Sequence, residues 1–254
     1  MTLARERHDG VEILRIDRPE AKNAVNGAVA NAIEAALDEI EGDPAVRVVV
    51  VTGTGDTFSA GADLKLVAAG RTREIHTERG GFAGFVTRRF PKPVIAAVNG
   101  TAVAGGFEIV LACDLVVASE TAVFGLFEVK RGLFAAAGGL IRMPRKLPPN
   151  LAMEIAIVGS TIDASRAHAL GLVNRVVPYE QVVTSALELA GQIAANAPLA
   201  VRASREMVLD AADLTEEQAW ARNRELQREV FAHPDAIEGA TAFAEKRPPV
   251  WTSS

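Results

Sequence analysis

Residues 94–108 read VIAAVNGTAVAGGFE, an apolar run that gives way to small residues and then to a carboxylate. The run Val94–Val98 is typical of a strand that is buried on both faces. The small residues after it, which end in Gly105-Gly106, let the backbone approach a ligand closely and leave N–H groups free to point at it. From Gly106 to Ala112 the pattern indicates a helix, with Glu108 near its start. This stretch therefore predicts a strand, a ligand-binding loop and a helix in succession.

A second stretch of the same kind lies earlier in the chain. The β-branched run Arg47–Gly53 predicts another buried strand, and the loop after it contains Ser59-Ala60-Gly61-Ala62-Asp63-Leu64. Two N–H groups from separate loops can form an oxyanion hole for a polarised carbonyl. Glu108 and Glu128 stand among apolar neighbours, and partial burial raises the pKa of a carboxyl toward the range that proton transfer needs. The combination indicates chemistry on an acyl thioester.

Composition narrows the class of protein. The 254 residues are 49% hydrophobic and 23% charged, which fits one large domain, or a core with an appendage, and disfavours disorder. The net charge of −5 disfavours a nucleic-acid partner. The single cysteine, Cys113, lies in an apolar run, so we expect a buried, inert thiol and a reducing compartment. The charged N-terminus is unlike a signal peptide, and no apolar run approaches the ~20 residues that span a membrane. We therefore expect a cytoplasmic protein with no membrane association.

The order of the apolar patterns predicts an α/β fold. Strand-like runs alternate with helical patterns, the strands at 11–17, 47–53, 94–98 and 115–118 and the helices at 26–40 and 106–112. Residues 66–81 are polar and irregular, and we expect a mobile flap over the ligand there. Beyond about residue 150 the pattern is almost entirely helical, with helices expected over 151–158, 165–170, 179–196, 199–211 and 214–231.

Taken in order, these motifs resemble those of the crotonase (enoyl-CoA hydratase/isomerase) superfamily. The resemblance begins at Ile16–Ala24 (IDRPEAKNA), runs through both small-residue loops, and continues through Leu170–Asn174 (LGLVN) to Phe243–Arg247 (FAEKR). It implies a crotonase-like spiral of ββα units over residues 1–195. It also implies an all-helical C-terminal region, residues 196–254, that serves trimerisation and covers the acyl pocket. The assembly implied is a homotrimer, or a homohexamer made of two trimers.

The resemblance assigns roles to the loops and to the two glutamates. The backbone amides of Ala62 and Gly105 correspond to the oxyanion hole that binds the thioester oxygen. Glu108 corresponds to the group that orients and deprotonates a water attacking Cβ of a trans-2-enoyl-CoA, and Glu128 to the group that supplies a proton at Cα. The activity implied is that of an enoyl-CoA hydratase, which forms a 3-hydroxyacyl-CoA in fatty-acid or related acyl-CoA catabolism.

Other positions match those that contact coenzyme A in the superfamily. Lys22 and Ala24 match residues along the CoA arm, and Phe243 and Lys246 match positions that often reach CoA from a neighbouring subunit. The residues that match the surroundings of the adenine or the pantetheine are Ala60, Asp63 and Leu64. For the two lysines, an ordinary solvated surface position is the alternative interpretation.

Several departures from the family pattern bear on the substrate. Ala104 stands where a third glycine is usual, which is tolerable if its φ is negative. Leu126-Phe127 replaces a polar–proline pair, and Phe134–Gly139 lacks the usual proline–glycine pair, so the floor of the acyl pocket is altered. The segment Glu128–Leu133 also resembles members with unusual acyl groups, including carnitinyl-CoA dehydratase-like and steroid side-chain enoyl-CoA hydratase-like branches. The basic cluster Arg142–Lys146 is either a contact for a phosphate-bearing ligand or a solvated turn.

Two other functions remain open at this point. An enoyl-CoA isomerase or a carnitinyl-CoA-type dehydratase uses the same scaffold, although isomerisation needs only one well-placed carboxylate. A non-catalytic acyl-CoA-binding protein is the alternative from a different class, and the retention of both glutamates argues against it. The four histidines show no metal-ligand spacing, and no phosphate-binding glycine motif opens a βαβ unit. We therefore expect no metal and no cofactor, with coenzyme A forming part of the substrate.

Overall fold

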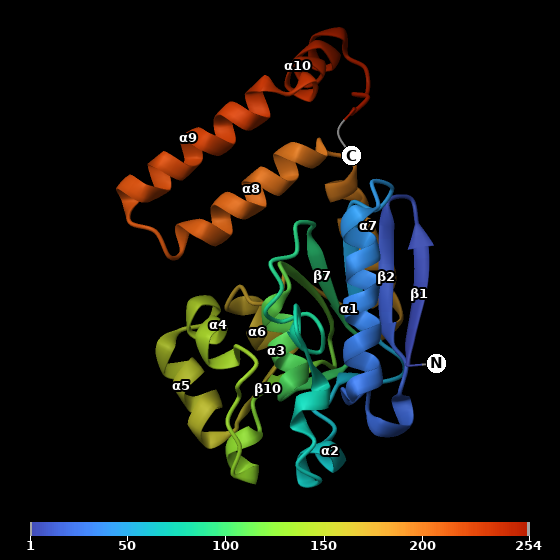
Figure 1. Ribbon diagram of the computed structural model, residues 1–254, viewed down its shortest axis with the longest axis vertical. Coiled ribbons are helices and arrows are strands. Elements are labelled where there is room, and N and C mark those ends of the chain that lie inside the picture. Colours follow the sequence, from blue (N-terminus) through green and yellow to red (C-terminus); the bar gives the residue numbers. More distant parts are fainter. Residues whose placement is uncertain (1, 253–254) are drawn as a thin grey trace.

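The computed structural model describes residues 2–252, and its main body is built around a six-stranded sheet (Figure 1). In spatial order, the strands are β1 Leu3–His8, β2 Val11–Ile16, β3 Val48–Gly53, β7 Val94–Val98, β9 Leu115–Ser119 and β12 Arg175–Val177. β1 is antiparallel to β2, and the remaining neighbours in this sheet are parallel. The four strands expected from the sequence are confirmed, and β1 is an additional strand that the charged N-terminal residues concealed.

Helices and apolar side chains cover this sheet on both faces. In β3, Val48 and Val50 belong to the cluster formed with α7 (Val182–Ala194), whereas Val49 belongs to the core that includes α1 (Gly27–Gly42). Successive side chains of a strand point to opposite faces, so a strand that is covered on both sides is apolar at every position. The unbroken valine run of β3 follows from this double burial.

A smaller sheet has the order β11-β10-β8-β4. Its strands are β4 Thr57–Ser59, β8 Thr101–Val103, β10 Val123–Gly125 and β11 Thr161–Asp163. β4, β8 and β10 are parallel, and β11 pairs with β10 in the antiparallel sense. Each parallel strand follows directly on a strand of the large sheet, and each is followed by a helix, namely α2 Leu64–Ala68, α3 Gly105–Ala112 and the short 3-10 helix η3 Glu128–Arg131. The repeated strand–strand–helix order confirms the expected spiral of ββα units.

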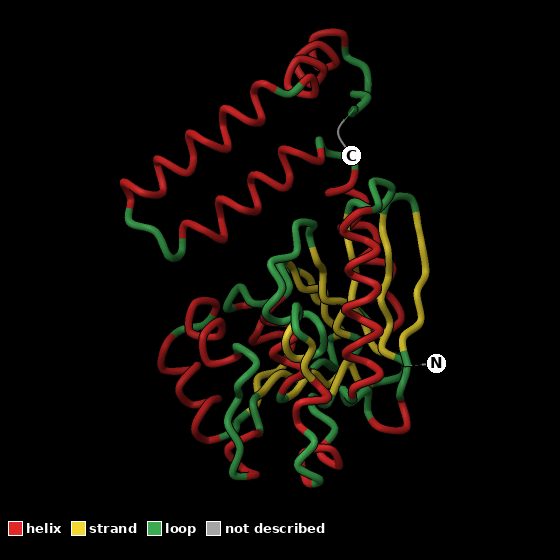
Figure 2. The backbone as a smooth tube through the Cα atoms, viewed as in Figure 1, coloured by secondary structure: helices red, strands yellow, loops and turns green. Residues whose placement is uncertain are grey.

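The C-terminal half is helical, as the sequence predicted. Its helices before α7 are α4 Gly139–Lys146, α5 Pro149–Val158 and α6 Ala164–Ala169, and those after it are α8 Pro198–Ala211, α9 Glu216–Ala232 and α10 Pro234–Glu245. Figure 2 shows α8 and α9 as a hairpin of helices that extends away from the sheets, with α10 beyond it. Within residues 2–252, no helix is long and apolar enough to cross a membrane.

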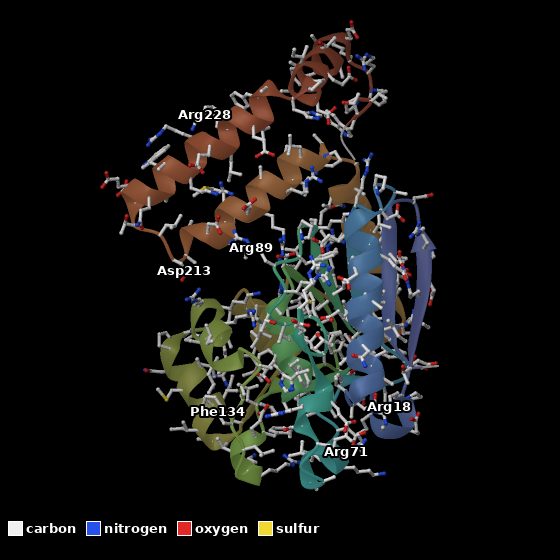
Figure 3. All side chains as sticks on the ribbon, viewed as in Figure 1. Arg18, Arg71, Arg89, Phe134, Asp213 and Arg228 are labelled. Carbon is white, nitrogen blue, oxygen red and sulfur yellow. The ribbon has the colours of Figure 1, made fainter. Side chains whose placement is uncertain are left out.

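Ion pairs attach this helical extension to the body. Arg205 of α8 bonds to Asp114 (Nε to Oδ2, 2.8 Å), and Arg89, which lies between the body and α8 in Figure 3, bonds to Asp210 (Nη2 to Oδ1, 2.6 Å). Because α7 covers the large sheet, the extension begins after it. A domain boundary between residues 195 and 196 stays a prediction.

The expectation of an irregular segment over residues 66–81 was wrong. Residues 66–81 are not irregular, because they include the end of α2, the 3-10 helix Thr72–Ile75 and the strands β5 (His76–Thr77) and β6 (Gly81–Phe82). Buried apolar side chains such as Ile75 hold this segment against the body. The segment is mostly polar and has few such residues, so the sequence did not predict its regular structure.

The basic cluster at 142–146 is not a solvated turn but part of α4. Lys146 donates from Nζ to the carbonyl oxygen of Cys113 (2.9 Å), and Arg142 donates from Nη2 to that of Val86 (2.5 Å). Both cations therefore point into the chain, where carbonyl groups satisfy them. The Cys113 thiol is buried, as expected, and burial raises its pKa.

Candidate active site

The candidate site lies where the parallel strands of the small sheet end. β4 ends at Ser59, β8 at Val103 and β10 at Gly125. Adjacent parallel strands point their carboxyl ends to the same edge of a sheet, so the loops that follow them lie together. The sequence candidates that these loops and α3 deliver to this edge are Ala60, Ala62, Gly105, Glu108 and Glu128.

Buried polar groups hold the first loop in its conformation. The Asn23 side chain donates from Nδ2 to the carbonyl oxygens of Thr54 (2.9 Å) and Thr57 (2.6 Å). Ser59 Oγ donates to the carbonyl oxygen of Asn23 (2.9 Å) and accepts the N–H of Gly61 (3.1 Å). Leaving such buried groups unpaired costs about 1–3 kcal/mol each, so this network fixes the loop. No role was predicted for Asn23 or Ser59, although a polar residue inside an otherwise apolar motif could have pointed to each of them.

The two small-residue loops touch each other directly. A Cβ on Gly61 would lie 2.5 Å from the amide nitrogen of Gly105, and φ at Gly61 is +86°, so only glycine suits this position. Gly105 has equally little space, since a Cβ there would lie 2.5 Å from Cζ of Phe82. The glycines therefore allow a close approach of the two backbones.

This contact brings two free amides to one place. The N–H groups of Gly61 and Asp63 are bonded to Ser59 and Val25, but that of Ala62, between them, donates to no atom of residues 2–252. The N–H of Gly105, the first residue of α3, likewise has no partner within that range. A helix N-terminus also carries a partial positive charge. Paired, unpartnered donors of this kind suit a developing oxyanion.

Ala104, between β8 and α3, does not meet the condition under which alanine would replace the usual glycine without strain, a negative φ. Its φ is +52° and its ψ is −132°, a region that glycine adopts readily and alanine does not. Its N–H donates to the carbonyl oxygen of Gly125 (2.8 Å), and its carbonyl accepts the N–H of Glu108 (3.1 Å). Hydrogen bonds thus hold the backbone of Ala104 on both sides of the residue, and its Cβ makes this backbone conformation strained.

Glu108 is a buried carboxylate with one fixed hydrogen bond. Its side chain, on the first turn of α3, is 3% exposed, and Oε1 accepts the N–H of Gly139 (2.8 Å). Burial, aided by the negative charge of Glu128, raises its pKa from 4.5 to about 7. The amides of Gly139 and Ala137 and the charge of Arg142 act in the opposite direction. A carboxyl with this pKa exists in both protonation states near neutral pH.

Glu128 stands at the start of η3, three residues after the end of β10. Its Oε2 is buried and has no hydrogen-bond partner in the described part of the chain. Burial raises the pKa of this carboxyl as well. Because the charges of Glu108 and Glu128 repel each other, the pair favours a state in which one carboxyl is protonated and the other is ionised. The site therefore combines an acid, a base and two free amides.

The segment around Lys22 and Ala24 lies against the first loop. The carbonyl oxygen of Lys22 accepts the N–H of Ala60 (3.0 Å), and Val25 pairs with Ala62 in a parallel bridge. Lys22 is exposed, and Ala24 is buried. The structure thus brings the predicted CoA-arm residues next to the oxyanion loop, while their contact with CoA stays a prediction.

Asp63 and Leu64 begin α2 at the same edge. Asp63 caps this helix by accepting the N–H of Lys65 at Oδ1 (3.2 Å) and forms an ion pair with Arg18 (Oδ2 to Nη2, 3.2 Å). Leu64 is exposed. The carboxylate of Asp63 is therefore engaged in local structure, and a direct contact with CoA would have to use its backbone or a remaining lone pair.

Phe243 and Lys246 are not brought to this site by their own chain. Phe243 lies in the last turn of α10 and Lys246 directly follows that helix, which lies at the opposite end of the molecule from α2 (Figure 1). The Phe243 side chain is 87% exposed, and Lys246 is also exposed. Any contact of these residues with CoA would involve another copy of the chain.

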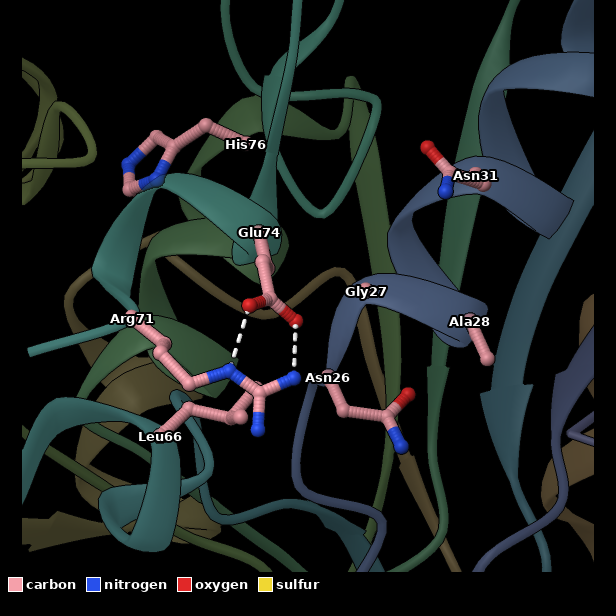
Figure 4. A pocket seen from close by; sticks show the side chains of 8 residues that line it. All are labelled: Asn26, Gly27, Ala28, Asn31, Leu66, Arg71, Glu74 and His76. Atoms are coloured by element: carbon pink, nitrogen blue, oxygen red, sulfur yellow. Dashed lines mark hydrogen bonds and ion pairs between the residues drawn. The ribbon is translucent and has the colours of Figure 1, made fainter. Parts of the chain in front are cut away.

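A separate hollow of about 500 Å³ opens at the start of α1 (Figure 4). Its lining residues are Asn26, Gly27, Ala28, Asn31, Leu66, Arg71, Glu74 and His76. Arg71 and Glu74 pair with each other there (Nε to Oε1, 2.5 Å). None of the predicted site residues lines this hollow. Within residues 2–252, no group of three or more His, Cys, Asp or Glu side chains is arranged to hold a metal ion.

Comparison with known proteins places this site in a family. Residues 6–254 match the family model described as enoyl-CoA hydratase/isomerase. A mevalonyl-coenzyme A hydratase (sidH) of Aspergillus fumigatus is 42% identical over 248 residues, which cover 95% of this chain and 91% of the relative.

Solved structures agree with this match. An enoyl-CoA hydratase of Mycobacterium tuberculosis H37Rv superposes with a TM-score of 0.95 at 43% identity and covers 100% of this chain and 99% of its own. A carnitinyl-CoA hydratase of Mycobacterium avium gives a TM-score of 0.77 at 47% identity, with coverage of 99% and 98%.

Proposed function

Because the chain belongs to the enoyl-CoA hydratase/isomerase family, we propose that it adds water reversibly to a trans-2-enoyl-CoA to give a 3-hydroxyacyl-CoA. Family membership confirms the crotonase-superfamily resemblance of the sequence and makes the protein a hydro-lyase that acts on acyl-CoA. The observation that carries the proposal is the meeting of a buried and a partly buried carboxyl, both of raised pKa, with two unpartnered amides.

The two carboxyls suit different proton-transfer roles. The Gly139 amide stabilises Glu108 as an anion, so Glu108 is the base that takes a proton from the attacking water. Burial raises the pKa of Glu128 toward the range of a general acid, and Glu128 delivers a proton to Cα. The amides of Ala62 and Gly105 hold the negative charge that develops on the thioester oxygen between these steps. Reversal of the same steps dehydrates a 3-hydroxyacyl-CoA.

A hydratase and a dehydratase are therefore one catalyst observed in opposite directions. Relatives with either kind of name, such as the mevalonyl-coenzyme A hydratase and the carnitinyl-CoA hydratase, fit the same arrangement. An isomerase needs one carboxyl to move a proton between two carbons. The second carboxyl, with its own raised pKa, favours hydration over isomerisation in this chain.

The proposal extends to the setting in which the enzyme works. Coenzyme A enters as part of the substrate and no further cofactor takes part, because carboxyls and amides suffice for the chemistry. A cytoplasmic enzyme of fatty-acid or related acyl-CoA catabolism fits a chain whose one cysteine is a buried free thiol. A homotrimer or homohexamer fits the large apolar side chains exposed on the helical extension, which include Trp220, Phe231 and Phe243.

Mass spectrometry of the reaction in D₂O tests this function. Crotonyl-CoA should gain one water and one deuterium at Cα, and 3-butenoyl-CoA serves as the isomerase substrate. Hydration of crotonyl-CoA supports the proposal. Conversion of 3-butenoyl-CoA without gain of water, together with inert crotonyl-CoA, would identify an isomerase instead.

Sedimentation analysis at micromolar concentration tests the assembly, and a monomer would contradict that part of the proposal.

A further inference from the structure

Arg142 is a partly buried cation whose charge acts on Glu108 and that has no part in the steps above. It lies on the first turn of α4, where Nη2 donates to the carbonyl oxygen of Val86 (2.5 Å) and Nη1 to that of Ala137 (3.4 Å). Its guanidinium also fills the space beside Gly138, a residue with a φ of +96°, where any Cβ would meet it. Arg142 thus joins the segment after β6 to the turn that begins α4.

That turn is the one that holds Glu108. Gly139, two residues after Ala137, donates its N–H to Oε1 of Glu108 (2.8 Å), and a Cβ on Gly139 would lie 3.0 Å from the same oxygen. Because the turn lies this close to the Glu108 carboxylate, any movement of the turn also moves the carboxylate. Fixing the Ala137 carbonyl therefore also fixes the hydrogen bond to Glu108.

The charge of Arg142 acts on the same carboxylate. Burial raises the pKa of Glu108 and the charge of Glu128 adds to this, whereas the charge of Arg142 lowers it. Burial in turn lowers the pKa of Arg142, and the Glu108 charge opposes that effect. An opposite charge of this kind favours the ionised form of a buried carboxyl.

We propose that Arg142 is a positioning residue for hydration, which fixes the 137–139 turn against Glu108 and favours the ionised form of that carboxyl. This inference rests on the proposed function, because an ionised Glu108 is what activates the water. The guanidinium suits the task, since its planar fork presents two separate nitrogens, Nη1 and Nη2, to the carbonyls of Ala137 and Val86.

The other titratable groups that act on this pair lie on η3, on α4 and at the end of α3. Glu128 faces Glu108 from η3, and Arg145, Lys146 and Cys113 interact with Arg142 from α4 and from the end of α3. The Cys113 thiol is neutral at ordinary pH because burial raises its pKa. β4 and β8, which also pack on α3, carry no titratable side chain. Arg142 is therefore the side chain whose removal should shift the balance at Glu108.

The pH profile of kcat/KM for crotonyl-CoA hydration tests the proposal. In Arg142→Gln, the acid limb that reports ionisation of Glu108 should move upward by about half a pH unit or more. Arg142→Lys keeps the charge, so its limb should stay near that of the wild type while kcat falls. Arg145→Gln is the matched control on the same helix, because Arg145 pairs with Asp213 at the surface, and it should behave as wild type. An acid limb that is the same in Arg142→Gln and wild type would overturn the proposal, whatever the loss of kcat.

A second measurement separates this inference from the proposed function. Infrared difference titration of the carboxyl bands, with Glu108→Gln as the reference for assignment, reads the pKa of Glu108 without turnover. A wild type that hydrates no enoyl-CoA would sink the proposed function, while the titration would still have to show a higher pKa for Glu108 in Arg142→Gln. Equal pKa values would overturn the role of Arg142. Arg142→Met, which matches the bulk of the stem, replaces Arg142→Gln in both experiments if that variant does not fold.

Discussion

Replacing Glu108 by glutamine should destroy activity and yet stabilise the protein at neutral and alkaline pH. The pKa of this carboxyl is raised from 4.5 to about 7 in the folded chain. Between these pH values the folded state binds the proton more tightly than the unfolded state, so the free energy of unfolding falls as pH rises. One pKa unit corresponds to about 1.4 kcal/mol, which puts the cost of ionising buried Glu108 at about 3 kcal/mol at pH 8 and below about 1 kcal/mol at pH 5.

Glutamine removes this cost without losing the hydrogen bond, since its side-chain oxygen can still accept the N–H of Gly139. Urea unfolding of wild type and Glu108→Gln at pH 5 and pH 8, at one protein concentration, measures the difference. The stability gain should grow by about 2 kcal/mol or more between the two pH values. Glu120→Gln, at an exposed position, is the control and should show no such growth. A gain independent of pH, or a variant less stable than wild type at pH 8, would refute the reasoning.

Three further substitutions test separate parts of the structure. Gly61→Ala places a Cβ 2.5 Å from the Gly105 nitrogen, so kcat for hydration should fall about 100-fold or more, and an active variant would contradict paired amides. Ala104→Gly removes about 1–3 kcal/mol of strain against a glycine cost of about 0.5–1 kcal/mol, so thermal melts should show a higher Tm, and a lower one would contradict the strain. Asp63→Ala loses the cap of α2 and the ion pair with Arg18, so urea unfolding should show a free energy of unfolding lower by about 1–2 kcal/mol. Asp63→Asn keeps an oxygen that can cap the helix, so it should lose less stability, and equal losses would contradict the capping role.

The sequence predicted those parts of the fold that repeat a simple pattern. Val94–Val98 and the valine run of β3 are apolar at every position because both faces of the large sheet are covered, and this marks buried strands. The small-residue loops were predicted equally well, since Gly61 and Gly105 lie where the two loop backbones meet. The glutamates stood out as carboxyls in apolar surroundings, and burial does raise the pKa of both.

Features that depend on contacts between distant segments were not predictable from these patterns. The positive φ of Ala104 is imposed by backbone hydrogen bonds to Gly125 and Glu108, and the local sequence does not predict these bonds. The sequence left Arg142 open between a ligand contact and a solvated turn, because the carbonyl of Val86, which it reaches, lies far away in the sequence. The distance of Phe243 from its own active site likewise follows from the direction in which the helical extension leaves the body.

The most direct test of the account is the absorbance of the conjugated enoyl thioester after enzyme is added to crotonyl-CoA and to a long or branched 2-enoyl-CoA. We expect prompt loss of absorbance with at least one of these substrates, slowed by about 100-fold or more in Glu128→Gln, because the glutamine side chain cannot deliver a proton to Cα. Tight binding of the enoyl-CoA without loss of absorbance, or loss that is equally fast in Glu128→Gln, would contradict it.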